Sequence, residues 1–230
     1  MHNVRRLSQA LANKLIFNGQ DRQGVLIGFD RRFLSNRAAE TSAEVFAGNN
    51  IPVTLLLEDA PTPLVTYATS RLNSAYGLVF TASHNPPEWN GLKVFRGDGS
   101  LLLDDETLEI TNEVSNLTAD QVIKLDLDLA VEAGIVKRCD MTNEYVDAVE
   151  KIIDMDAIRK ANLRVIVDPM YGVGQLTLGI LLTEARCRVT FIHERHNPLF
   201  GGRSTAPDLE SLRMLMNDIQ EGHYDLGLAT

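Results

Sequence analysis

Residues 77–95 read GLVFTASHNPPEWNGLKVF, and this stretch decides both the expected fold and the expected chemistry. The apolar run at 77–80 predicts a strand, and the run at 93–96 predicts a second, shorter one. Between them, two prolines and an Asn-Gly pair exclude a helix and indicate a rigid loop at 81–91. Open α/β sheets bind their ligands in loops that follow the carboxyl ends of strands. We therefore expect the functional groups of the chain at this loop.

Three side chains in or just after this loop suit covalent phosphoryl transfer. Ser83 offers a hydroxyl, His84 an adjacent base, and Lys93 a cation two residues beyond the loop. A serine hydroxyl needs a base to act as a nucleophile, and a phosphoryl group needs positive charge around it. Taken one at a time, each residue is better explained by a structural role: Ser83 as a turn cap, His84 as a surface histidine and Lys93 as a solvated strand end. Their combination favours the chemical interpretation.

Strands and helices alternate on both sides of the loop, which predicts an α/β protein with two three-layer α/β/α domains. The expected strands lie at 25–30, 53–57, 77–80, 163–167, 188–192 and 224–229, with helices between them. Residues 118–141 are the least regular part of the sequence. We expect a first domain at 1–118, a linker at 119–141 and a second domain at 142–230.

Composition excludes several classes of function. A net charge of −9 and a pI near 5.0 argue against nucleic-acid binding, which needs concentrated Lys and Arg. No stretch approaches the ~20 apolar residues of a membrane helix, so no membrane partner is expected. The N-terminal residues lack the apolar core of a secretory signal, and the two cysteines form no CxxC pattern. A cytoplasmic protein with reduced thiols is expected.

Two groups of residues are weighed as metal sites. Asp126 and Asp128 lie in an alternating segment typical of a solvated strand face. His193, Glu194 and His196 lie in an expected loop, where exposed histidines are the better interpretation. Neither group offers the ligand set that a metal requires.

The pattern Thr-Ala-Ser-His-Asn-Pro-Pro-x-x-Asn-Gly-x-Lys at 81–93 resembles the phosphoserine loop of the α-D-phosphohexomutases, the phosphoglucomutases and phosphomannomutases. The resemblance implies that Ser83 is phosphorylated at rest, donates its phosphoryl group to a hexose monophosphate and takes one back from the bisphosphate. It further implies that His84 and Lys93 assist proton transfer and neutralise the phosphate, and that Asn85 contacts the substrate.

A second motif of that family, Gly-x-Asp-x-Arg-x-x-Ser, matches residues 28–35 and implies that Arg32 binds substrate. An ion pair with Asp30 or with a helix neighbour explains Arg32 equally well. The turn at 168–174 also matches the family's second domain. For the first domain the resemblance implies a mixed sheet in the order 2-1-3-4, with the last strand antiparallel.

The resemblance covers the first two of the family's four domains. In the family, the strand corresponding to 224–229 leads into an Asp-Gly-Asp-x-Asp-Arg loop that holds Mg²⁺ against the phosphoserine oxygen. The sequence ends at Thr230, before such a loop. We therefore expect Mg²⁺ in the complete family enzyme, with Ser83 as its one ligand here, and a second sheet without its last strand.

These features predict a fragment or truncated form of a phosphoglucomutase or phosphomannomutase, an isomerase acting on hexose phosphates, which alone does not complete the catalytic cycle. Two alternatives stay open. One is a non-catalytic phosphosugar-binding or regulatory module, and the other is a slow phosphoserine hydrolase. The strand at 224–230 is expected to leave a bare edge and to support a homodimer.

Overall fold

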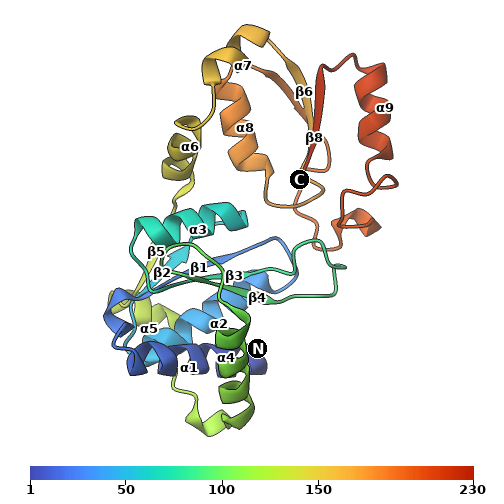
Figure 1. Ribbon diagram of the computed structural model, residues 1–230. Helices are drawn as coiled ribbons and strands as arrows, with labels where there is room; N and C mark the ends of the chain where they lie inside the picture. Colours follow the sequence, from blue (N-terminus) through green and yellow to red (C-terminus); the bar gives the residue numbers. More distant parts are fainter. The chain divides into compact units, whose positions relative to one another are not determined.

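The structure is a computed structural model that describes residues 1–230. Its chain forms two compact units, shown in Figure 1. The first contains Met1–Phe29, Leu34–Thr81 and Gly91–Asp140. The second contains Met141–Thr230 together with two short loops, Asp30–Phe33 and Ala82–Asn90. None of the helices is long and apolar enough to cross a membrane.

A five-stranded mixed sheet forms the centre of the first unit, in the order β4-β3-β1-β2-β5. Its strands are β1 (Val25–Phe29), β2 (Val53–Leu56), β3 (Tyr76–Phe80), β4 (Leu92–Arg96) and β5 (Val136–Cys139). All neighbouring pairs are parallel except β3 and β4, which are antiparallel. The order 2-1-3-4 with an antiparallel last strand is therefore confirmed, and β5 extends the sheet beyond β2.

The segment expected to be a linker, 119–141, is more regular than the sequence suggested. It contains a short 3₁₀ turn (Ala119–Gln121), helix α5 (Leu127–Glu132) and strand β5, which pairs with β2 along its whole length. The alternation of Asp and Leu at 126–129 marks the start of a helix, because the Asp126 side chain accepts a hydrogen bond from the backbone N–H of Asp128. Leu127 and Ala130 are buried at helical spacing, so the expected strand face was wrong.

Helices cover both faces of this sheet because alternate strand residues point to opposite sides. They are α1 (His2–Phe17), α2 (Ser35–Gly48), α3 (Thr62–Arg71) and α4 (Asp104–Asn116), with α5. Val25, Ile27 and Leu55 belong to a core shared with α1, α2, α4 and α5. On the other face, α3 packs so closely that a Cβ at Gly28 would lie 2.6 Å from Val65 and one at Gly77 would lie 2.0 Å from Thr69. Figure 1 shows α3 alone on that face.

The second unit repeats the three-layer plan on a smaller scale. Its sheet has the order β7-β6-β8 and is parallel throughout, with strands β6 (Arg164–Asp168), β7 (Arg188–Phe191) and β8 (Leu226–Ala229). Its helices are α6 (Thr142–Glu150), α7 (Met155–Ala161), α8 (Gln175–Glu184) and α9 (Arg213–Glu221). Gly179 of α8 faces Phe191, whereas Gly227 faces Ile219 of α9, so α8 and α9 cover opposite faces (Figure 1).

The N-cap residues of α1, α3 and α6 are Met1, Pro61 and Met141. None of these three N-caps makes a side-chain capping bond. The elements themselves formed as expected, because buried apolar faces contribute more to helix stability than a cap does.

We predict that Val136→Ala destabilises the first unit, since β5 belongs to its sheet and Val136 is only 1% exposed. Its free energy of unfolding in urea should fall by on the order of 2 kcal/mol, from lost burial and the cavity left behind. Lys137→Ala, at an exposed position of the same strand, is the control and should change it by less than about 0.5 kcal/mol. Equal effects of the two substitutions would mean that β5 is not part of the folded core.

Candidate functional site

The serine loop, Ala82–Asn90, leaves the carboxyl end of β3, and the loop Asp30–Phe33 leaves the carboxyl end of β1. These strands are parallel neighbours, and their last residues, Phe29 and Phe80, are paired. Both loops therefore emerge at the same edge of the sheet and lie side by side. This is the edge at which open α/β sheets bind ligands.

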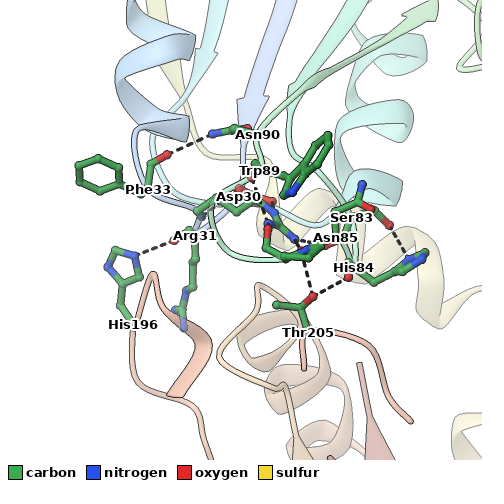
Figure 2. A network of polar contacts seen from close by, with 12 residues as sticks. Asp30, Arg31, Phe33, Ser83, His84, Asn85, Trp89, Asn90, His196 and Thr205 are labelled. Carbon is green, nitrogen blue, oxygen red and sulfur yellow. Dashed lines mark hydrogen bonds and ion pairs between the residues drawn. The ribbon is translucent and has the colours of Figure 1, made fainter. Parts of the chain in front are cut away.

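Ser83 lies exposed on this loop with a left-handed backbone, φ 57°. A residue with a Cβ adopts this conformation at a cost of about 1–2 kcal/mol, so the surrounding contacts must hold it there. Ser83 Oγ lies 3.3 Å from Nδ1 of His84, and the dashed line between the two side chains in Figure 2 marks this contact. A hydroxyl beside an imidazole nitrogen is the pairing expected of an activated serine.

Arg32 holds the serine loop from within. Its side chain is buried, at 3% exposed, and its Nη1 and Nη2 atoms donate hydrogen bonds to backbone carbonyls of the loop. The accepting carbonyls and their distances are Ser83 at 2.6 Å, Asn85 at 2.7 Å, Pro86 at 2.8 Å and Trp89 at 3.1 Å. One side chain thus fixes the path of the loop at four points.

Two further contacts compensate the buried charge of Arg32. Its Nε lies 3.4 Å from Oδ2 of Asp30, and its guanidinium carbon lies 5.2 Å from the centre of the Phe200 ring, a cation–π distance. Burial lowers the pKa of Arg32, and the Asp30 carboxylate acts in the opposite direction. The ion pair with Asp30 is one of the two interpretations that the sequence left open. Contact between Arg32 and substrate stays a prediction.

Residues 194–205 of the second unit add an outer layer of contacts to the two loops. Thr205 Oγ1 lies 2.5 Å from the carbonyl oxygen of His84 and 2.9 Å from that of Asn85. His196 Nε2 donates to the carbonyl of Arg31, at 3.0 Å. Figure 2 shows both side chains pointing toward the loops. No sequence signal indicated this support, because a hydroxyl that contacts a backbone carbonyl leaves no motif.

The structure brings Ser83, His84, Asn85 and Arg32 together in one network. Asn85 is exposed at its side chain while its carbonyl is held by Arg32 and Thr205. Lys93 lies half-buried on β4, where it pairs with Val79 of β3. The roles expected of Asn85 and Lys93 toward a phosphorylated substrate stay predictions.

A second polar pair, at the carboxyl end of β6, was misjudged from the sequence. Asp168 is 1% exposed, and its Oδ2 lies 2.9 Å from Nδ1 of His193, which was expected to be an exposed loop residue. Because a carboxylate can only accept, Nδ1 of His193 carries the proton. Asp168 Oδ1 also accepts from the backbone N–H of Met170, at 2.8 Å, and the Tyr171 ring lies 5.1 Å from the His193 ring.

No group of three or more His, Cys, Asp or Glu side chains is placed to hold a metal ion. Ser83 offers one hydroxyl oxygen, whereas Mg²⁺ requires several oxygen ligands around it. The residues of this chain do not fit a Mg²⁺ site.

Comparison with known proteins agrees with this architecture. Family models described as phosphoglucomutase/phosphomannomutase, alpha/beta/alpha domain I and domain II, match residues 1–121 and 143–230. The chain belongs to this family. A phosphoglucomutase/phosphomannomutase of Thermococcus kodakarensis is 29% identical over 97% of this chain. A phosphoglucosamine/phosphogalactosamine mutase of Sulfurisphaera tokodaii is 29% identical over 98% of it.

Among solved structures, one from Thermus thermophilus, described as a candidate phosphomannomutase, superimposes with a TM-score of 0.87 at 27% identity and covers 99% of this chain. The chain spans about half the length of the relatives it matches, 48% of each of the two curated proteins and 50% of the solved one. The comparisons therefore support the fold and the family over the whole of this sequence.

We predict that His193→Ala destabilises the second unit, because it leaves the Asp168 carboxylate buried without this partner. Its free energy of unfolding should fall by about 1–3 kcal/mol. His196→Ala removes an exposed imidazole from the same loop and should change it by less than about 0.5 kcal/mol. Urea titrations followed by circular dichroism measure both values. A loss no larger for His193→Ala than for His196→Ala would refute the assigned role.

Proposed function

We propose that Ser83 is the phosphoryl carrier of a phosphohexomutase that interconverts hexose 1-phosphate and hexose 6-phosphate. The single observation that carries this proposal is the geometry of Ser83, an exposed hydroxyl in a left-handed conformation, 3.3 Å from His84 Nδ1, on a loop fixed by a buried guanidinium. Membership of the family supports the substrate class.

The proposed step transfers a phosphoryl group from a hexose bisphosphate to the serine. Ser83 Oγ attacks phosphorus, and the bond between phosphorus and the hexose oxygen breaks. The Oγ proton passes to His84 Nδ1 and then to the departing hexose oxygen, which leaves as a hydroxyl. The reverse step returns the phosphoryl group to a hexose monophosphate. General acid–base assistance of this kind accelerates a reaction by about 10²–10⁴-fold.

Other residues are assigned by their place around this step. Lys93 would neutralise charge on the phosphoryl group, and Asn85, exposed on the loop, would contact the substrate. Mg²⁺ remains the cofactor expected of the complete family enzyme. The residues of this chain do not form its site, and no step described here depends on it. The proposed location is the cytoplasm.

The exposure of Ser83 favours a second function, slow hydrolysis of the phosphoserine. Water reaches an exposed phosphoryl group unless a closed site excludes it. In this alternative Ser83 is phosphorylated as in the mutase, but water takes the phosphoryl group in place of a hexose monophosphate.

We predict that incubation with glucose 1,6-bisphosphate adds one phosphoryl group to Ser83, detected by intact-mass spectrometry and peptide mapping. His84→Ala should slow the labelling by about 10²-fold or more, because the proton of Oγ loses its acceptor. His223→Ala removes an exposed histidine from outside the network and should leave the rate unchanged.

Equal labelling of Ser83→Ala would contradict the proposal. Decay of the adduct after removal of the bisphosphate, faster than that of a phosphoserine peptide, would favour the hydrolase.

We also propose that the protein self-associates through the edge of the second sheet. Strand β8 pairs only with β6, and Leu226 at its start is 41% exposed. An edge strand with exposed apolar side chains is a template for pairing with a second chain. Two copies related by a two-fold axis would join their sheets through β8.

We predict a concentration-dependent dimer in light scattering after size exclusion. Leu226→Lys should shift the protein to monomer, since a charge on an edge strand opposes pairing. The control is Leu209→Lys, which places the same charge at an 81% exposed position outside the strand and should leave the dimer intact. A wild-type monomer at all concentrations would refute the edge contact.

A further inference from the structure

We propose that Arg32 is the positioning residue of the phosphoryl-transfer step, and that its guanidinium holds Ser83 in the left-handed conformation from which Oγ reacts. This inference rests on the proposed function of Ser83. It assigns to Arg32 a contact with the protein's own backbone instead of the contact with substrate that its motif implied.

The two prolines of the loop leave it with fewer backbone N–H donors than carbonyl acceptors. The carbonyls of Asn85 and Pro86 belong to peptide bonds whose nitrogen is that of a proline, so these peptide units carry an acceptor and no donor. Buried or half-buried carbonyls require hydrogen-bond partners. Within the loop, the Trp89 N–H donates to the Pro86 carbonyl at 3.0 Å, and Arg32 adds donors to the Asn85 and Pro86 carbonyls from the neighbouring loop, at 2.7 and 2.8 Å.

The bond to the Ser83 carbonyl is the one that bears on reactivity. Arg32 Nη2 lies 2.6 Å from this oxygen, so the peptide plane that follows Ser83 cannot rotate without breaking the bond. The orientation of that plane, together with φ 57°, determines where Cβ and Oγ point. Relaxation of Ser83 to an ordinary backbone conformation would remove the strain and turn the hydroxyl away from its reactive position.

Lysine could not replace arginine in this role. The carbonyls span residues 83–89 and are reached by two separate nitrogens, Nη1 and Nη2, each of which serves two of them. A guanidinium presents its donors as a planar fork, whereas an ammonium is a single point with fewer hydrogens. The planar shape also matches the Phe200 ring at 5.2 Å. Arg32→Lys keeps the positive charge but loses the planar arrangement of N–H donors.

The chain offers a direct probe of the loop. Trp89 is the only tryptophan, is 61% exposed, and accepts one of the Arg32 hydrogen bonds at its carbonyl. Its backbone N–H donates to the carbonyl of Pro86, which Arg32 also contacts. The fluorescence anisotropy decay of the wild-type protein therefore reports whether this loop moves with the protein or independently of it.

We expect Arg32→Lys to add a fast component, on the nanosecond scale of loop motion, to the anisotropy decay of Trp89. The rate of Ser83 phosphorylation by glucose 1,6-bisphosphate should fall on the order of 10²-fold, as for a displaced reacting group. The bisphosphate concentration at half-maximal rate should stay the same, because a positioning residue does not bind the substrate. Arg37→Lys, the same exchange on the exposed side of α2, is the control and should change neither reading.

Each outcome decides the proposal. An unchanged anisotropy decay in Arg32→Lys, or a mobile loop with an unchanged phosphorylation rate, overturns it. A changed half-maximal concentration with an unchanged maximal rate shows substrate binding instead, and also overturns it. If Arg32→Lys does not fold, Asp30→Asn replaces it. This variant removes the charge that faces Nε at 3.4 Å and should give the same two effects in weaker form, and their absence overturns the proposal.

The two proposals fail in different ways. If the wild-type protein cannot be phosphorylated at Ser83, the proposed function fails, and the anisotropy of Trp89 alone decides whether Arg32 holds the loop. If Ser83 is phosphorylated equally fast in both proteins, the proposed function stands and the role of Arg32 fails.

Discussion

The parallel pairing of β1 with β3 is the constraint on which the site depends. Phe29 and Phe80 are paired at the carboxyl ends of these strands. The loops that follow the two strands therefore start level with each other at the same edge of the sheet. Arg32 and Ser83 are 51 residues apart in sequence, yet this register makes them neighbours. A shift of one residue in this pairing would displace the start of one loop relative to the other.

The charge of Arg32 then organises the loop. A guanidinium at 3% exposure must be compensated, and here four backbone carbonyls, the Asp30 carboxylate and the Phe200 ring surround it. Such an arrangement costs desolvation energy, but it favours a single conformation of the loop, in which all these carbonyls point toward Arg32. The prolines add rigidity to the same path by fixing φ at two successive residues. A strained serine is sustainable only in a setting of this kind.

The same kind of turn follows the central strand of each sheet, after β1 and at the end of β6. Asp30 follows β1 and accepts from the backbone N–H of Arg32, at 3.0 Å, and Asp168 ends β6 and accepts from that of Met170, at 2.8 Å. In each case the second carboxylate oxygen faces a basic side chain, Arg32 or His193. An aspartate that satisfies the amide two residues later turns the chain sharply out of the sheet. The basic partner keeps the carboxylate from being buried alone.

Sequence by itself determined the α/β class, the order of the first four strands through the family resemblance, and the place of the serine loop. It could do so because these features rest on local signals, such as apolar runs, Asn-Gly and Pro-Pro pairs and the adjacency of Ser83 and His84. It did not predict strand β5 within 119–141, the segment expected to be a linker, since a four-residue strand has little signal until β2 pairs with it. It also placed His193 on the surface, because burial of an imidazole depends on a carboxylate 25 residues away. The role of Arg32 was decided by tertiary structure alone: a side chain that binds backbone carbonyls recognises the path of the chain, and that path exists only once the strands have paired.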